Sequence, residues 1–273
     1  MHPNILARRN GDTSGRMCTL VILRRPDHRW PVLIGANRDE MIDRPWEAPE
    51  RHWPDRPEVV AGLDNLAGGS WLGINDWGVA AAVLNRHGSL GPAPDRRSRG
   101  ELVLEALDHA DAAAAAEALS HLDPAAYRTF NLIIADERDG FWLRHSGGAR
   151  IELHPVKNGL SMIAAGDLND ISTRRLELAL PAFREWPAPD PDRDDWSAWE
   201  SLLGSTRAPS GEPVTTAMRF RDDGYGTTSS AVIAIPALDE LDRKPIFRFA
   251  GWLPEPTPWR DVFSLAKRST APQ

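Results

Sequence analysis

Residues 17–40, MCTLVILRRPDHRWPVLIGANRDE, decide how this chain folds. They contain two runs of apolar and β-branched residues, 18–23 and 31–36, and the segment between them carries the proline and polar residues that are typical of a turn. This pattern predicts a β-hairpin with its turn near residues 27 and 28, in which the numbers of paired residues add up to about 55 or 56. The first residues of the hairpin then lie beside its last residues.

The only cysteine of the chain, Cys18, stands at the start of this hairpin and follows a methionine at which translation can begin. If translation starts at Met17, or if residues 1–16 are removed, loss of the methionine leaves Cys18 with a free α-amine. The reference pKa of such an amine, about 7.7 to 8.0, suits a general base near neutral pH. One residue then supplies both nucleophile and base, which is the N-terminal-nucleophile arrangement.

The pairing of the hairpin places Cys18 opposite Asn37 or Arg38, within reach of a guanidinium. We expect Arg38 to lower the pKa of the thiol, and Asp39 to accept hydrogen bonds from the α-ammonium of Cys18. Side chains alternate along a strand, so Arg38 and Asp39 point to opposite faces unless a bulge or the strand end turns one of them. Without its neighbours, Cys18 reads as a small buried apolar residue, and Arg38 and Asp39 as a surface ion pair.

The rest of the chain predicts strands, then helices, then strands, helices and strands again, which is the order of an α+β protein. Residues 44–57 carry four prolines and are expected to form an extended loop. Strands are expected at 59–61, 70–74, 78–84, 130–136, 141–145, 149–153, 160–164, 227–235 and 245–251, and helices at 100–108, 112–119, 173–184 and 196–203.

Several short motifs of this chain together resemble one family. They are Met-Cys-Thr at 17–19, GANRDE at 35–40 with Arg44-Pro45, AGLD at 61–64, GGSWLGI at 68–74, VLN at 83–85, RGEL at 99–102, FNLIIAD at 130–136, GLS at 159–161 and YGT at 225–227. The chain is similar to the NRDE family, also called the transport and Golgi organisation protein 2 family. The resemblance implies an N-terminal-nucleophile hydrolase-like fold, a four-layer αββα sandwich of two antiparallel sheets between helices, related to choloylglycine-hydrolase-type and penicillin-acylase-type amidases.

The chain departs from the family pattern in three places. Members usually have Asn where this chain has Met162, and Arg where it has Thr228, so chemistry or specificity can differ if those positions bind substrate. The pattern also lacks residues 1–16, which we interpret as a misassigned start or a removed segment. Residues 17–273 are then expected to form a single domain.

Asn85 ends a buried strand and is the candidate donor to an oxyanion, a role worth about 3 to 4 kcal/mol in a transition state. A structural interpretation is a turn residue before residues 86–88. Resemblance to the choloylglycine-type motif, in which an Asn ends the equivalent strand, favours the functional one. Trp71, which can belong to the core or line an apolar pocket, and Asn37 are the candidates for substrate binding.

The composition excludes several classes of function. The chain has 273 residues, a net charge of -7 and a pI near 5.6, which argues against nucleic acid or an anionic membrane surface as its main partner. One cysteine excludes an intramolecular disulfide, so we expect a cytoplasmic protein, and no apolar run reaches the roughly 18 residues that a transmembrane span needs. No sequence pattern typical of a zinc site, covalent haem, a nucleotide-binding loop or a serine triad occurs, so we expect no metal and no cofactor.

These observations predict an enzyme that hydrolyses or transfers an amide- or thioester-linked acyl group through a Cys18 acyl-enzyme, with Arg38, Asp39 and Asn85 in the catalytic site. The alternative is a non-enzymatic carrier or trafficking protein for an apolar ligand such as haem or a lipid. A trafficking adaptor without a ligand is a third possibility, and no sequence feature of its own supports it.

Overall fold

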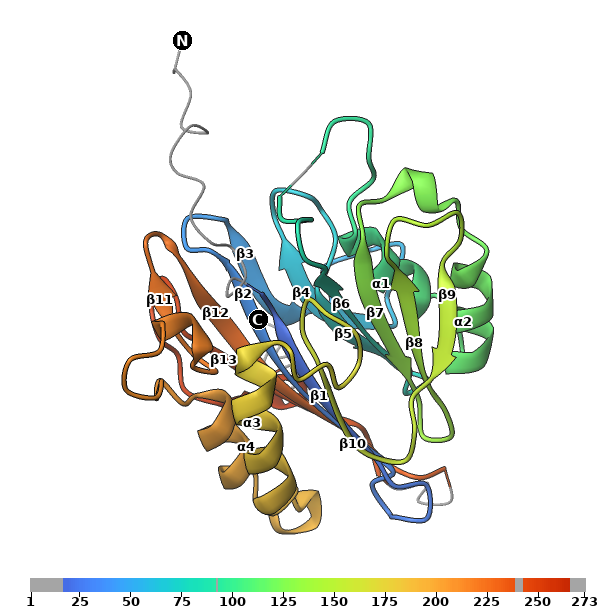
Figure 1. The fold of residues 1–273 in the computed structure, drawn as a ribbon. Coiled ribbons are helices and arrows are strands. Elements are labelled where there is room, and N and C mark those ends of the chain that lie inside the picture. The colour runs from blue at the N-terminus through green and yellow to red at the C-terminus, as the bar shows by residue number, and fades with distance from the viewer. Residues whose placement is uncertain (1–16, 92, 239–242, 266–273) are drawn as a thin grey trace, which may run out of the picture.

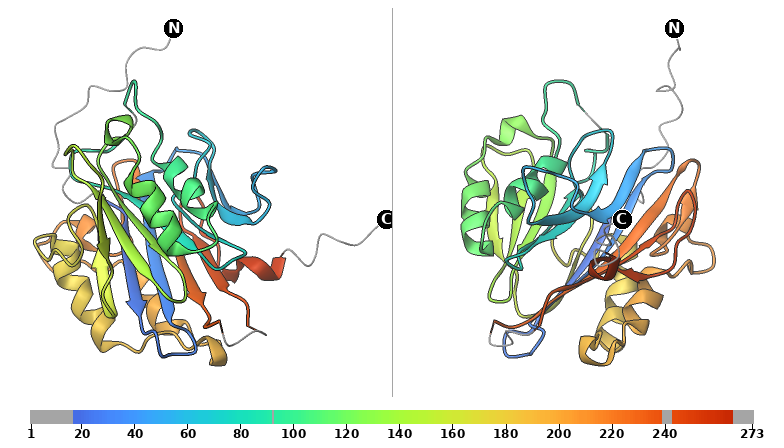
Figure 2. Two further views of the ribbon diagram at one scale, coloured as in Figure 1. Left: turned by 90° about the vertical axis from the view of Figure 1, so that its right-hand side faces the viewer. Right: turned by 180° about the vertical axis from the view of Figure 1, so that it is seen from behind.

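The computed structural model describes residues 17–91, 93–238 and 243–265. In this part of the chain, two seven-stranded antiparallel sheets face each other and helices cover their outer surfaces (Figure 1). The helical layers lie on opposite sides of the molecule when it is viewed from behind (Figure 2, right).

The first sheet contains the predicted hairpin at its centre. Segments far apart in sequence lie side by side in it, because β2 is flanked by β1 from the start of the chain and by β12 from near its end. The strand order is β10 (Gly159–Ile163), β1 (Thr19–Arg24), β2 (Val32–Met41), β12 (Tyr225–Ile235), β13 (Ile246–Gly251) and β14 (Arg260–Asp261), and β11 (Arg221–Asp222) pairs with β12.

The second sheet is a meander in which strand order follows chain order. It runs β3 (Trp46–Glu50), β4 (Val59–Asp64), β5 (Leu72–Asn75), β6 (Ala80–Asn85), β7 (Phe130–Ala135), β8 (Gly140–His145) and β9 (Glu152–Pro155). The helices are α1 (Gly100–Leu107), α2 (Ala112–Ser120), α3 (Arg174–Glu185), α4 (Ser197–Leu203) and α5 (Val262–Leu265), with short 3-10 helices η1 (Pro124–Ala126), η2 (Pro191–Arg193) and η3 (Val214–Thr216).

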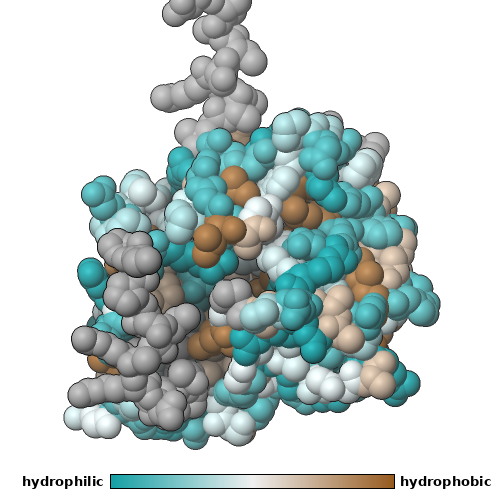
Figure 3. Space-filling model, turned by 90° about the horizontal axis from the view of Figure 1, so that it is seen from above, coloured by the Kyte–Doolittle hydropathy of each residue, from teal (hydrophilic) through white to brown (hydrophobic). Residues whose placement is uncertain are grey.

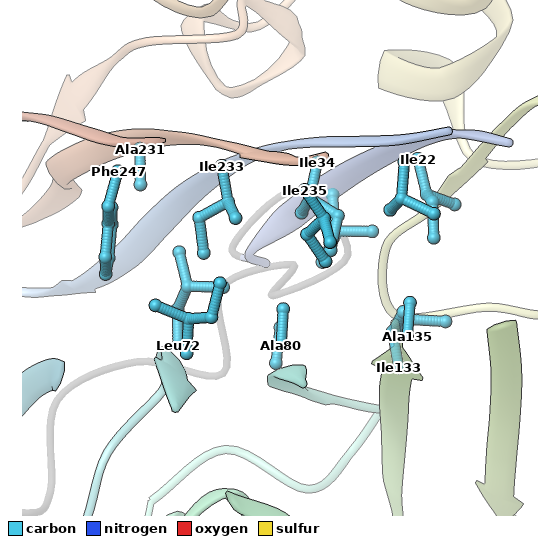
Figure 4. Packing of buried hydrophobic residues seen from close by; sticks show 14 of the residues in the cluster. Ile22, Ile34, Leu72, Ala80, Ile133, Ala135, Ala231, Ile233, Ile235 and Phe247 are labelled. Carbon is cyan, nitrogen blue, oxygen red and sulfur yellow. The ribbon is translucent and has the colours of Figure 1, made fainter. Parts of the chain in front are cut away.

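The alternation of side chains along the strands builds three apolar layers. Ile22, Ile34 and Ile233 of the first sheet point toward Leu72 and Ile133 of the second sheet and form the central core (Figure 4). Because successive side chains point to opposite faces, the intervening residues of the first sheet pack against α3 and α4, and those of the second against α1 and α2. The four-layer αββα sandwich expected from the sequence is confirmed.

The hairpin register is the one that the turn position predicts. Thr19 pairs with Asn37, so paired numbers add up to 56 and Cys18, the preceding residue, comes opposite Arg38. The expectation of a loop at 44–57 is wrong for part of that segment, because it contains β3. Pro49 is tolerated there because β3 is an edge strand that pairs only with β4, and its ladder is irregular beside that proline.

Within the described residues, no helix has the length and apolar character needed to cross a membrane. The face of the molecule seen from above is mostly hydrophilic, with hydrophobic residues in small separate areas (Figure 3).

Candidate active site around Cys18

Cys18 lines a cavity of about 210 Å³ that both sheets and the loop before α1 enclose. Four of the residues proposed from the sequence, Cys18, Arg38, Trp71 and Asn85, meet in this cavity, and Asp39 contributes to its wall. The further lining residues are Glu40, Arg44, Asp64, Ala67, Ser70, Val83, Gly91, Ala93, Arg96, Arg97, Ser98, Arg99, Gly100 and Arg128.

The thiol of Cys18 is held at the edge of β2 by the backbone of Asp39. The Asp39 amide donates to Sγ at 3.4 Å, and Sγ donates to the Asp39 carbonyl oxygen at 3.6 Å. Burial and the nearby Asp39 carboxylate raise the pKa of Cys18 to about 12, whereas Arg38 lowers it by a smaller amount. The prediction of a low thiol pKa is therefore wrong for the chain in which Met17 precedes Cys18, and a nucleophilic thiolate there needs a base.

Arg38 faces the space between the sheets and is almost fully buried. Its guanidinium contacts Asp64 Oδ2 at 3.3 Å and Thr228 Oγ1 at 3.2 Å, and it lies 4.4 Å from the centre of the Trp71 ring. The Trp71 ring itself packs over Gly62, where a Cβ atom would come within 2.4 Å of the ring. A glycine in β4 therefore permits the position of Trp71, and Trp71 and Asp64 together fix the orientation of Arg38.

Asp39 points to the other face of β2, as strand alternation requires. Its carboxylate accepts hydrogen bonds from Arg175 of α3 at 2.6 Å and from Thr227 Oγ1 at 2.7 Å, beside an irregularity in the pairing of β12. Burial raises the pKa of Asp39, and Arg175 and Thr227 act in the opposite direction. Arg175 also donates to the Met17 carbonyl oxygen at 2.7 Å, so it lies beside the backbone nitrogen of Cys18.

Asn37 lies outside the cavity, and the substrate-binding interpretation of this residue has no support in the structure. Its amide donates to the carbonyl oxygens of Leu203 and Met218, and its side-chain oxygen accepts from Ser230. All of these partners lie on the helix-covered side of the first sheet. Asn37 is therefore a structural residue that ties β2 to the end of α4.

Asn85 ends β6 and borders the cavity, as the sequence predicts. Within the described part of the chain, its side-chain amide has no hydrogen-bond partner from the protein. The neighbouring strand offers a contrast: the amide of Asn131 on β7 is fully buried and donates to the Ala164 and Gly166 carbonyl oxygens. Asn85 is therefore placed to donate to a bound molecule, whereas Asn131 holds the fold.

The two departures from the family motifs have different structural consequences. Met162 is buried on the outer face of the first sheet against the helical layer and does not border the cavity. The Thr228 hydroxyl accepts a hydrogen bond from the Arg38 guanidinium and donates one to the Arg38 carbonyl oxygen. Only the second departure touches the site.

Sequence reasoning missed the arginines that surround Cys18 from distant parts of the chain. Arg175, Arg44, Arg99 and Arg128 each approach the site through tertiary packing. For Arg99 a signal exists, because it opens the RGEL motif, but the start of a helix explains that motif equally well. No cluster of three or more His, Cys, Asp or Glu side chains within the described ranges is arranged to hold a metal ion.

Comparisons with known proteins agree with this architecture. The sequence profile of the family described as Transport and Golgi organisation 2 matches residues 17–242. The homologue of that protein from Bos taurus is 40% identical over 114 residues, and the one from Mus musculus is 36% identical over 115 residues. Each of these matches covers 38% of this chain and 38% of the relative.

Among solved structures, a Caenorhabditis elegans orthologue of N-acylethanolamine-hydrolyzing acid amidase has a similar fold. The two chains superpose with a TM-score of 0.56 at 14% sequence identity, and the match covers 84% of this chain and 98% of the other. The architecture of the two packed sheets is therefore that of an N-terminal-nucleophile hydrolase-like fold.

Proposed function

We propose, since this chain belongs to the Transport and Golgi organisation 2 family, that it is an N-terminal-cysteine hydrolase or acyltransferase that acts on an amide or thioester. The observation that carries the proposal is the convergence of the Cys18 thiol and the Asn85 amide on one enclosed cavity, from strands of two different sheets. A nucleophile and a donor to an oxyanion on two sides of a cavity are the minimal parts of an acyl-transfer site.

The active form in this proposal begins at Cys18. Its α-amine takes the proton of the thiol, and the sulfur attacks the carbonyl carbon of the substrate. The carbonyl oxygen becomes an oxyanion that accepts a hydrogen bond from Asn85. Collapse of the intermediate breaks the bond to the leaving amine or thiolate, which receives the proton from the α-ammonium, and water or an acceptor amine then attacks the acyl-enzyme in the same way.

Arg175 has a defined part in this proposal. It pairs with Asp39 and lies next to the position of the α-nitrogen, so its positive charge disfavours the ammonium form of Cys18 and keeps the amine available as a base. Asp39, on the same side, accepts a hydrogen bond from that nitrogen. Arg38, held by Asp64 and Trp71, favours the thiolate once it forms.

The second candidate, a carrier of haem or of a lipid-like ligand, has one supporting observation, which is the raised pKa of the thiol. The cavity itself favours the enzyme. Sites for large apolar ligands usually enclose about 300 to 1,000 Å³ and are lined mainly by hydrophobic side chains. The Cys18 cavity is smaller, and arginine and carboxylate side chains make up much of its wall.

The experiment that tests the proposal combines intact mass with turnover. The natively expressed chain is weighed to establish whether Cys18 is its first residue, and wild type and Cys18→Ser are then assayed against a panel of amides and thioesters. We expect a chain that starts at Cys18 and turnover that the serine variant loses. Turnover of wild type no higher than that of Cys18→Ser across the whole panel would reject the enzyme.

A further inference from the structure

The charges around the Cys18 cavity are unevenly distributed between its walls. On the wall formed by β2 and β4, Asp64 Oδ2 lies 3.3 Å from Arg38 and 2.7 Å from Arg44, and Glu40 lies 3.8 Å from Arg44. The two cations there are matched by two carboxylates. This wall has little capacity left to attract a charged ligand.

The opposite wall, formed by the loop before α1 and the segment that leads into β7, carries Arg96, Arg99 and Arg128. Arg99 donates to Ser89 Oγ at 2.8 Å and to the Thr129 carbonyl oxygen at 3.0 Å. Arg96 donates to the carbonyl oxygens of Ala125 and Tyr127, and Arg128 to those of Gly88, Leu90 and Gly91. These neutral acceptors orient the guanidinium groups without cancelling their charge.

Arg99 is the most informative of the three. In the described part of the chain, no carboxylate lies within salt-bridge distance of it. Burial and the positive charge of Arg128 lower the pKa of Arg99 to about 10, while the ionised forms of Cys18 and Glu40 raise it. A half-buried cation beside a second cation is costly unless an anion is bound, because desolvation and like-charge repulsion both oppose it.

A groove of about 930 Å³ continues from this wall toward the surface. Ala93, Arg96 and Arg128 line both the cavity and the groove, so the arginines stand at the junction of the two. The groove is also lined by His145, whose Nδ1 is buried and has no hydrogen-bond partner among the described residues. A leaving group held at the junction has an open route out after the acyl bond is cut.

We propose that the cavity recognises substrates whose leaving group carries an anion, a carboxylate or a phosphate, which Arg96, Arg99 and Arg128 bind. The substrate class is therefore an acyl amide of an anionic amine, of which an N-acyl amino acid is the simplest member. This inference rests on the proposed acyl-transfer site for the position of the scissile bond. The recognition of the anion is a matter of binding and is measured without turnover.

The test uses the full chain with Cys18→Ala and three probes that share one acyl group: N-hexanoylglycine, N-hexanoyl-O-phosphoethanolamine and neutral N-hexanoylethanolamide. Isothermal titration calorimetry measures their dissociation constants. We expect at least one anionic probe to bind about tenfold or more tighter than the neutral one, because hydrogen bonds to a charged, partly buried group are stronger than neutral ones. The tighter of the two anions identifies the preferred source of the charge.

Arg99→Met should abolish this preference, and Arg128→Met provides a second test if the first variant is unfolded by circular dichroism. Arg51→Met removes an exposed arginine that pairs with Asp76 outside the cavity, and it should retain the preference. Equal affinities of all three probes, no binding of either anion, or a preference that survives both cavity substitutions would overturn the proposal. A preference without turnover in wild type would reject the enzyme and leave the anion site standing, whereas turnover without a preference would do the reverse.

Discussion

Arg175 donates a hydrogen bond of 2.6 Å to Asp39, and this ion pair joins α3 to β2 directly behind Cys18. Both side chains are almost completely buried, at 2% and 0% exposure. Breaking such a pair leaves an uncompensated charge in the interior, so its loss has consequences for stability as well as for chemistry.

Arg175→Met is expected to lower the free energy of unfolding by about 3 to 5 kcal/mol, because Asp39 keeps its burial and loses its cation. Urea denaturation measures the change. The double variant Arg175→Met/Asp39→Asn should recover part of the stability without recovering turnover. Arg174, the preceding residue, forms exposed pairs with Glu177 and Glu212, and Arg174→Met should cost no more than about 1 kcal/mol. Equal losses for the two arginines would contradict the role of the buried pair.

The reactivity of Cys18 should depend on whether Met17 precedes it. With the methionine in place, burial holds the pKa of the thiol at about 12, so iodoacetamide labelling should be slow near pH 8 and increase steeply only above about pH 10. A chain that begins at Cys18 should react faster near pH 8, since the amine accepts the proton. Arg38→Met should slow labelling further by removing a charge that lowers this pKa. Rapid labelling near pH 8 of the Met17-containing form would count against the buried thiol.

The same pKa shift has a consequence for stability. The thiol pKa is raised from 9.0 in the unfolded chain to about 12 in the folded one. The folded state therefore binds this proton more tightly, and the contribution to stability is complete below pH 9 and is lost as pH rises toward 12. Cys18→Ala should remove this part of the alkaline decline in denaturation curves of the Met17-containing chain.

The position of Trp71 should depend on the absence of a side chain at Gly62. Gly62→Ala places a Cβ within 2.4 Å of the Trp71 ring, so the ring has to move away from the Arg38 guanidinium. Such overpacking typically costs about 1 to 3 kcal/mol. Gly148→Ala is the matched control, since no atom lies within 4 Å of the place that its Cβ would take, and its unfolding midpoint should stay near that of wild type. Intrinsic tryptophan fluorescence reports the displacement of the ring.

The sequence predicts the parts of the site that arise from local pairing. The turn position determines which residue faces Cys18, and alternation correctly separates Arg38 from Asp39. Nothing in the sequence tells which face of β2 is buried against helices, so the expectation that Asn37 binds substrate misses its contacts with the other layer. Arg175 lies 136 residues from Asp39 along the chain, and only the packing of α3 on the first sheet brings them together. Contacts of this kind have no periodicity that a single sequence reveals.

Asn85 and Asn131 lie on neighbouring strands and should respond in opposite ways to the same substitution. Asn85→Ala is expected to lower kcat by about 10²-fold or more with little change in KM or stability, because its amide acts on the oxyanion of the transition state. Asn131→Ala removes hydrogen bonds to two buried carbonyl oxygens and to Arg86 and Trp142, so it should lower the unfolding midpoint instead. Steady-state kinetics and thermal denaturation of both variants separate the two roles. If Asn85→Ala unfolds as readily as Asn131→Ala while its folded fraction keeps the wild-type kcat, the oxyanion role of Asn85 is excluded.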